Sequence, residues 1–252
     1  MPASLDSVAV DQNKLDEIAN AERSLQAFHN GRPLKPFALT FGQQWWGKWE
    51  TVHAAFERLG IAPPASVLEV GCGTGWGSHF LAEAGYLPLG VDIAPGNVAI
   101  AEGIAERWSS VARFAEADME ALDLAETFDA VLLFDALHHS ERPADVIAGV
   151  ARHLKPGGWV LFGEPSWLHG ISPNARRVTR EKGWVEKGIR VSELKRDCRA
   201  AGLGGFRRFH EGTRAYEGRL GPFAWQLVRL VAANAWVAPQ AHIWLAAQRP
   251  PA

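Results

Sequence analysis

Apolar and polar residues alternate along the middle of this chain with two different periods. Short apolar runs at 66–70, 87–92, 112–117, 128–134 and 159–165 have the length and composition of buried strands. Segments centred on 75–85, 97–108 and 142–154 lie between these runs and carry apolar residues at helical spacing. Strands that alternate with helices in this way predict βαβ units and a parallel sheet.

The residues ahead of this region follow a helical pattern. Segment 11–28 is predicted to form an amphipathic helix, because its apolar residues recur at helical spacing among charged ones. A second helical segment, 48–60, follows a proline- and glycine-containing stretch and a cluster of tryptophans that includes Trp45 and Trp46. We interpret residues 1–60 as a helical and aromatic cap, and residues 61–252 as the main domain.

After Pro165 the alternation is interrupted. Residues 166–190 are too many and too polar for an ordinary connection, and we interpret them as an insertion that acts as a substrate lid. A helix at 191–202 follows, then the segment 203–210, an apolar helical stretch at 222–237 and a final strand at 241–248.

Composition limits the classes of protein to consider. The chain has 252 residues, of which 47% are hydrophobic, and a formal net charge of −2, which gives no global field for nucleic acid or an anionic membrane. The first residues lack the basic and apolar segments of a secretory signal, and no apolar run approaches the ~20 residues of a membrane span. Two cysteines exclude a disulfide framework. We expect a cytoplasmic protein.

The most informative segment is EVGCGTG, residues 69–75. It follows a predicted strand and opens a predicted helix, so its backbone N–H groups face a ligand at the strand ends. The dinucleotide fingerprint G-x-G-x-x-G fails here, because Trp76 and Ser78 stand where its last glycine would be. Asp92 ends the next strand, where a carboxylate can accept hydrogen bonds from both hydroxyls of a ribose.

Five segments in this order and at these intervals resemble the class I S-adenosylmethionine-dependent methyltransferases. They are VLEVGCGTG, GVDIAP, AEADMEAL, FDAVLLFDALHH and LKPGGWVLFGEP. The resemblance implies a Rossmann-like, doubly wound α/β fold: a seven-stranded sheet, mostly parallel with an antiparallel last strand, and helices on both faces.

The same resemblance implies a site for S-adenosylmethionine, which leaves as S-adenosylhomocysteine. Glu69 and the backbone of Gly71, Cys72, Gly73 and Gly75 would hold the methionyl end, with Asp92 and Ile93 at the ribose. Asp118 and the Met119 backbone would hold the adenine, and Phe134 and Asp135 would line the pocket beside the reacting sulfonium.

Two histidines follow the fourth strand at the edge where α/β active sites lie. His138 or His139 can take a proton from the acceptor near neutral pH, with His138 preferred because Asp135 precedes it by one helical turn. The alternative is that the pair only orients the loop, since in-line methyl transfer depends mainly on positioning. A metal held by His138, His139, Glu141 and Asp145 is not predicted, because adjacent histidines on a turn usually diverge.

Candidate acceptor-binding residues come from three places. Trp45 and Trp46 offer aromatic faces, and Glu164 ends the fifth predicted strand, where it binds the acceptor or caps the following turn. Arg176 and Arg177 stand in the basic part of the insertion and suit an anionic acceptor, unless they form a solvated helix face.

These features favour an enzyme that moves a methyl group to an oxygen, rather than a nitrogen or carbon, of a small molecule. The acceptor is expected to be aromatic or anionic, with no nucleic-acid or membrane partner and a homodimer as one possible assembly. A noncatalytic S-adenosylmethionine-binding scaffold is the alternative, and a nicotinamide oxidoreductase fits the glycine spacing less well.

Overall fold

The structure is a computed structural model that describes residues 12–30, 42–182, 186–209 and 242–252. Its centre is a seven-stranded sheet with the strand order β3-β2-β1-β4-β5-β7-β6. The strands are β1 (Ser66–Val70), β2 (Leu87–Asp92), β3 (Arg113–Glu116), β4 (Phe128–Phe134), β5 (Leu154–Pro165), β6 (Gly204–Phe209) and β7 (His242–Gln248). The last strand, β7, runs antiparallel to both of its neighbours, and the pairs among β1 to β5 are parallel. The predicted fold class is confirmed.

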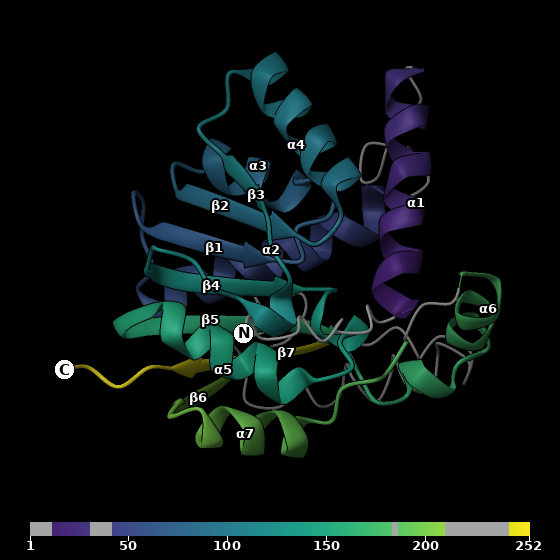
Figure 1. Ribbon diagram of the computed structural model, residues 1–252. Coiled ribbons are helices and arrows are strands. Elements are labelled where there is room, and N and C mark those ends of the chain that lie inside the picture. Colours follow the sequence, from purple (N-terminus) through teal and green to yellow (C-terminus); the bar gives the residue numbers. More distant parts are fainter. Residues whose placement is uncertain (1–11, 31–41, 183–185, 210–241) are drawn as a thin grey trace, which may run out of the picture.

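Helices surround the sheet (Figure 1). They are α1 (Gln12–His29), α2 (Gly42–Leu59), α3 (Trp76–Glu83), α4 (Pro95–Trp108), α5 (Pro143–His153), α6 (Pro173–Lys182) and α7 (Val191–Ala200), with 3-10 turns η1 (Met119–Ala121), η2 (Leu137–His139) and η3 (His169–Ile171). One buried cluster joins α2 and α3 to the sheet, and a second joins α5 and α7 to its other face. The helix predicted at 222–237 lies outside the described residues.

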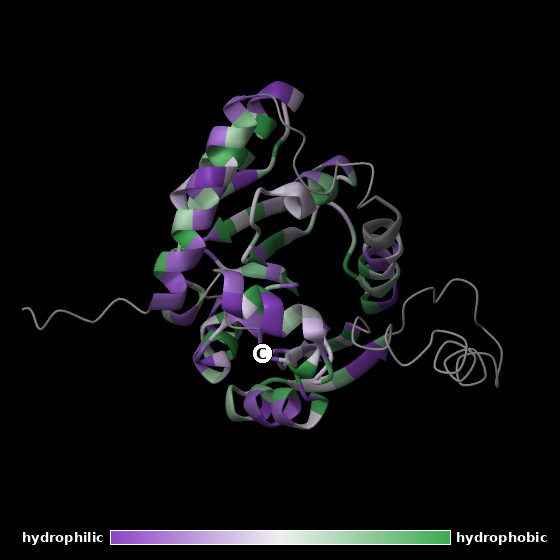
Figure 2. Ribbon diagram, turned by 90° about the vertical axis from the view of Figure 1, so that its right-hand side faces the viewer, coloured by the Kyte–Doolittle hydropathy of each residue, from purple (hydrophilic) through white to green (hydrophobic). Residues whose placement is uncertain are grey.

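The strand sequences explain this two-sided burial. In β1, Val67 belongs to the cluster with α2, whereas Leu68 and Val70 belong to the cluster with α5, because successive side chains point to opposite faces. Strands covered on both faces read as continuous apolar runs rather than as alternating ones. Figure 2 shows the hydrophobic colouring concentrated along the strands, with mixed colouring on the outer helices.

The two N-terminal helices play different structural roles. α2 packs directly on the sheet through Trp49, Val52 and Phe56, so this part of the predicted cap contributes to the core of the main domain. α1 lies outside the sheet beside α4 (Figure 1). Gly96 permits this approach, because a Cβ there would come within 3.0 Å of the Ala21 carbonyl group.

The parallel strands β1 to β5 all end at the same edge of the sheet. The glycine turn after β1 and the 3-10 turns η1 and η2 lie at this edge. None of the described helices combines the length and the apolar character that a membrane-spanning helix needs.

His79 on α3 is a buried histidine, and it makes the stability of the folded protein depend on pH. The His79 side chain is fully buried against Trp108 and Phe114, and its Nε2 has no hydrogen-bond partner among the described residues. Burial lowers the pKa of His79, so the unfolded chain takes up a proton at a higher pH than the folded protein does.

We therefore expect the free energy of unfolding to fall as the pH drops below about 6.5, the ordinary histidine pKa. The His79→Phe variant keeps an aromatic ring and should lose less stability than the wild type between pH 7.5 and 5.5. Urea unfolding at both pH values measures this difference. Equal losses in the two proteins would show that His79 is not a source of the acid sensitivity.

Candidate functional site

The glycine turn connects β1 to α3 at the carboxyl edge of the sheet. Gly71, Gly73 and Gly75 all have positive φ, at 72°, 54° and 78°, which other residues rarely adopt. A Cβ at Gly71 would lie 2.6 Å from the Cβ of Ala136, whereas one at Gly73 would project into open space. The turn thus needs glycine for its conformation and leaves room above the backbone for a ligand.

Asp92, the last residue of β2, lies beside this turn. Its Oδ2 accepts a hydrogen bond from the backbone N–H of Gly73 at 2.8 Å, and its Oδ1 accepts from the Ala94 N–H and the Asn97 side chain, both at 3.0 Å. Burial raises the pKa of Asp92, against the effect of these hydrogen bonds. The two carboxylate oxygens have four lone-pair positions, of which these hydrogen bonds use three, so one position on Oδ2 remains for a ligand.

A cavity of about 200 Å³ opens at this point. Eight residues that the sequence predicted for the site line it together: Gly71, Gly73, Asp92, Ile93, Asp118, Met119, Asp135 and His139. The carboxyl edge of a doubly wound sheet is where such folds bind their ligands, because the connections diverge there. The convergence of these residues makes this cavity the candidate site.

One wall of the cavity is α1, which supplies Asn13, Lys14, Glu17 and Asn20. Lys14 Nζ lies 2.7 Å from Asp118 Oδ2 and 3.0 Å from Glu120 Oε2, and Asn13 donates to the His139 carbonyl group at 3.1 Å. The four α1 residues were not among the predicted site residues, because an amphipathic helix pattern shows which face is buried but not which cavity that face borders.

Glu120 ties α1 to the connections around it. Burial alone would raise its pKa, but hydrogen bonds from Ser140 and the Arg142 backbone, together with Lys14, lower the pKa of Glu120 to about 2. The carboxylate is therefore charged at neutral pH and holds η1, η2 and α1 together.

At the other end of the cavity, Asp135 is held by two residues that the sequence analysis did not single out. Its Oδ1 lies 2.6 Å from His242 Nε2 on β7, and its Oδ2 lies 3.4 Å from Lys48 Nζ on α2. Burial opposes ionisation, but the hydrogen bond from His242 and the charges of His242 and Lys48 hold the pKa of Asp135 well below its ordinary value. No local motif links three residues so far apart in the chain.

Aromatic rings gather next to Asp135. Phe134 stacks on Trp244 with ring centroids 5.6 Å apart, and it meets the edge of Trp76 at 5.5 Å. Trp49 in turn contacts Trp76 at 5.7 Å. Phe134, Trp244 and Trp49 are buried, so the half-buried Trp76 is the ring of this group that can present a flat face to a ligand or a cation. Trp45 and Trp46 lie in the first half of α2, and their side chains are outside the described part of the structure.

The two predicted histidines have different environments. His138 is buried, and its Nδ1 lies 2.8 Å from Glu164 Oε2, whereas His139 lines the cavity. Burial lowers the pKa of His138, but the hydrogen bond to Glu164 and the charges of Glu164, Asp135 and Glu186 outweigh this and raise it. Of the two, His139 is the one on the wall of the candidate cavity.

Glu164 organises the η2 turn. Its fully buried carboxylate accepts hydrogen bonds from the backbone N–H groups of Ala136, Leu137 and His138, at 3.1, 2.9 and 3.3 Å. Because of these hydrogen bonds, the Glu164 carboxylate lies beneath the η2 turn and does not line either cavity. The turn that Glu164 caps is the one after β4, not the turn after β5 that the sequence analysis considered.

Two predicted cofactor residues lie behind the glycine turn. Glu69 is buried, accepts a hydrogen bond from Ser78 at 2.6 Å and packs against Gly77, where a Cβ would clash with its carboxylate. Burial raises the pKa of Glu69 to about 7, although the Ser78 hydrogen bonds oppose the change. Cys72 is buried as well, and burial raises the pKa of its thiol, so it packs as a small apolar residue.

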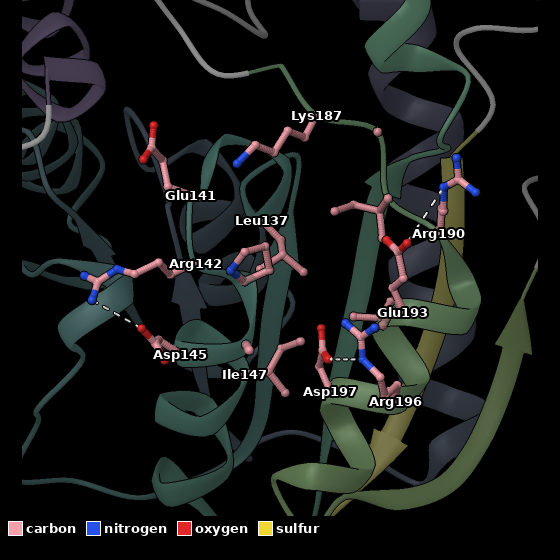
Figure 3. A pocket seen from close by; sticks show the side chains of 15 residues that line it. Leu137, Glu141, Arg142, Asp145, Ile147, Lys187, Arg190, Glu193, Arg196 and Asp197 are labelled. Carbon is pink, nitrogen blue, oxygen red and sulfur yellow. Dashed lines mark hydrogen bonds and ion pairs between the residues drawn. The ribbon is translucent and has the colours of Figure 1, made fainter.

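Arg176 and Arg177 lie on α6 and are exposed, and neither lines a described cavity. A second cavity, of about 490 Å³, lies between α5, α7 and residues 187–190 (Figure 3). Six of its charged groups pair with one another, as Arg142 with Asp145, Arg190 with Glu193 and Arg196 with Asp197, whereas no ion pair among the described residues includes Glu141 or Lys187. None of the residues that the sequence predicted for the site lines this second cavity.

The fold and the first cavity define a class of protein: an α/β enzyme of the S-adenosylmethionine-dependent type, with a glycine turn, a carboxylate after β2 and a carboxylate after β3. Residues 68–162 match a family model described as "Methyltransferase domain".

Proteins with similar sequences are named as methyltransferases. The chain is 30% identical over 215 residues to the ubiquinone biosynthesis O-methyltransferase of Bordetella avium, an alignment that covers 80% of this chain and 84% of that protein. It is 34% identical over 189 residues to the protein of the same name from Idiomarina loihiensis, covering 64% and 74% of the two chains.

Solved structures share the fold. An S-adenosylmethionine-dependent methyltransferase from Mesorhizobium loti superposes with a TM-score of 0.60 at 18% identity, over 81% of this chain and 98% of its own. The [4+2]-cyclase SpnF superposes with a TM-score of 0.66 at 20% identity, over 94% and 96% of the two chains. The chain belongs to the class I S-adenosylmethionine-dependent methyltransferases, its methyl donor is S-adenosylmethionine and its acceptor is a small molecule.

Proposed function

We propose that this enzyme methylates a hydroxyl oxygen on the aromatic ring of a small, quinone-like molecule. The observation that carries the proposal is Trp76, a half-buried ring that packs edge-on against Phe134, the residue before the cavity-lining Asp135. Flat ring faces stack on an aromatic acceptor and stabilise the nearby sulfonium cation without an ion pair. The names of the relatives, which place them in ubiquinone biosynthesis as O-methyltransferases, support an oxygen acceptor.

We propose the following roles at the cofactor. Asp92 Oδ2 accepts a hydrogen bond from a ribose hydroxyl, Asp118 and the Met119 backbone hold the adenine, and the backbone of the glycine turn holds the methionyl end. Glu69 and Cys72 support that turn from below. S-Adenosylmethionine supplies an electrophilic methyl group whose bond to sulfur breaks as the acceptor oxygen bonds to carbon.

The protein's contribution to the chemistry is to aim the acceptor and to receive its proton. Holding the oxygen in line with the methyl–sulfur bond supplies most of the acceleration, because it replaces a bimolecular encounter with a positioned one. The ring hydroxyl loses its proton as the oxygen attacks, and we assign its acceptance to His139, the histidine on the cavity wall. His138 instead anchors η2 through Glu164.

The direct test uses labelled methyl donor and a panel of acceptors with the purified protein. We expect methyl transfer to aromatic rings that carry adjacent hydroxyl groups, and no transfer to the same rings with amines in place of the hydroxyls. Transfer to the amines alone would overturn the oxygen assignment. Tight binding of S-adenosylmethionine without turnover on any ring would favour an acceptor of a different class.

Replacement of His139 tests the assignment of the base. We expect His139→Ala to lower kcat by roughly 100-fold, the lower end of the range for general acid–base catalysis, with the affinity for S-adenosylhomocysteine nearly unchanged. His139→Gln keeps a polar side chain of similar length and should be equally slow. A kcat close to that of the wild type in both variants would show that positioning alone carries the reaction.

A further inference from the structure

Three potential metal ligands from separate parts of the chain converge beside η2. They are His138 Nε2 on η2, His169 Nε2 on η3 and Glu186 Oε2 in the segment between α6 and α7. Glu186 Oε2 lies 2.7 Å from His169 Nε2 and 3.8 Å from His138 Nε2, and all three atoms lie within 4.8 Å of one another. The side chains are only 6%, 15% and 8% exposed in the order His138, His169, Glu186.

A hydrogen bond to Glu164 fixes the orientation of the His138 ring. Its Nδ1 is bound to Glu164 at 2.8 Å, and the same carboxylate is held by three backbone N–H groups of η2. Nε2 therefore points toward Glu186. Histidines that bind metals usually have such a carboxylate on the other ring nitrogen, because it fixes the tautomer and raises the basicity of the ligand atom.

The two carboxylates of this cluster, Glu164 and Glu186, need a positive charge nearby. Glu164 and Glu186 are two buried carboxylates, and among the described residues no lysine or arginine forms an ion pair with either of them. Neutral imidazoles add no charge, and a buried carboxylate without a compensating cation is costly. The positive charge must come from protons on the imidazoles or from a bound metal ion.

We propose that His138, His169 and Glu186 bind one divalent transition-metal ion, with Zn²⁺ as the best match. Zinc takes imidazole nitrogen at about 2.0–2.1 Å and carboxylate oxygen at about 2.0–2.2 Å, which sets tetrahedral ligand atoms roughly 3.4 Å apart. The two measured separations from Glu186, 2.7 and 3.8 Å, lie on either side of that value, so small side-chain movements bring all three atoms onto one ion. Mg²⁺ fits poorly, because it prefers oxygen ligands.

The metal would fasten the insertion to the active-site edge of the sheet. The insertion already meets this edge through the backbone, where Lys187 N–H donates to the His138 carbonyl group at 3.1 Å and Ile189 N–H donates to that of Pro165 at 3.0 Å. His139 lines the cofactor cavity directly beside His138. The ion would thus hold the segments that carry His169 and Glu186 against the turn that carries His139. This inference does not depend on which acceptor the enzyme methylates.

The test measures metal binding in the full-length protein, independently of activity. The purified protein is treated with a chelator, dialysed, and titrated with Zn²⁺ or Mg²⁺ alone, and bound metal is measured by elemental analysis after equilibrium dialysis. We expect one Zn²⁺ per chain, little Mg²⁺, and a rise in melting temperature with Zn²⁺, because the ion binds the folded state.

Variants of the three ligands identify the site. Glu186→Gln and His169→Asn should each weaken zinc binding at least 100-fold, whereas the exposed-residue controls Glu181→Gln and His29→Asn should bind zinc as the wild type does. Binding of S-adenosylhomocysteine by each variant shows that it has folded. Absence of zinc from the wild type, or equal zinc in all five proteins, would overturn the proposal and leave protonated histidines as the source of the positive charge.

Discussion

Replacing Asp92 with alanine is expected to weaken the binding of S-adenosylmethionine by at least about 100-fold. A hydrogen bond to a charged group contributes about 1.5–3 kcal/mol, and a 100-fold loss of affinity corresponds to about 2.7 kcal/mol. The same carboxylate also holds the Gly73 N–H at 2.8 Å, so its loss loosens the turn that faces the ligand. Isothermal titration calorimetry with the cofactor and with S-adenosylhomocysteine measures the effect.

Two further variants separate the causes. Asp92→Asn keeps the size of the side chain and one acceptor oxygen, and should bind the cofactor with an affinity between those of the wild type and Asp92→Ala. Asp123→Asn changes an exposed carboxylate in the loop after η1 and should have no effect. If folded Asp92→Ala binds within a few-fold of the wild type, the assignment of Asp92 to the ribose is wrong.

The second large effect is expected at Glu164, and it concerns stability. Removing one partner of a buried charged pair costs about 3–5 kcal/mol, because the remaining polar groups lose their compensation. Glu164→Ala strips the acceptor from three backbone N–H groups and from His138 at once. For a chain of this length the melting temperature should fall by about 10 °C.

The control variants test whether the charge and the hydrogen bonds both contribute. Glu164→Gln retains an acceptor oxygen and should lose less stability than Glu164→Ala, whereas the exposed Glu181→Gln should melt like the wild type. Calorimetry in the absence of ligand gives the three values. A Glu164→Ala protein that melts within about 2 °C of the wild type would show that η2 does not depend on this carboxylate.

The fold could be predicted from the sequence because its signals are local. Apolar runs of strand length, the glycine turn and the helical segments each depend on neighbours in the chain. The bounds of β1 to β4 and of β7 agree with the predicted strands within one residue, whereas β5 begins five residues earlier than predicted. Much of the cofactor cavity was predictable for the same reason. Gly71, Asp92, Asp118 and Asp135 each directly follow a strand or lie within two residues of its end, and parallel strands end at one edge.

The remaining site residues come from contacts between distant segments. Lys14 reaches Asp118 from α1, and His242 reaches Asp135 from the last strand, across 104 and 107 residues of sequence. His169 and Glu186 stand in an insertion whose polar composition resembles any exposed loop. Nothing in their neighbourhoods marks them, because tertiary packing alone brings them to the sheet edge.

The placement of α1 also has an evolutionary consequence. The helix borders the cofactor cavity, yet it packs on α4 rather than on the sheet, and the buried clusters around the strands do not include it. Substitutions on its cavity face can therefore accumulate without disturbing the hydrophobic core that folds the domain. Selection can reshape the entrance to the cavity through α1 while the sheet and the glycine turn stay the same, and this separation lets one architecture diversify.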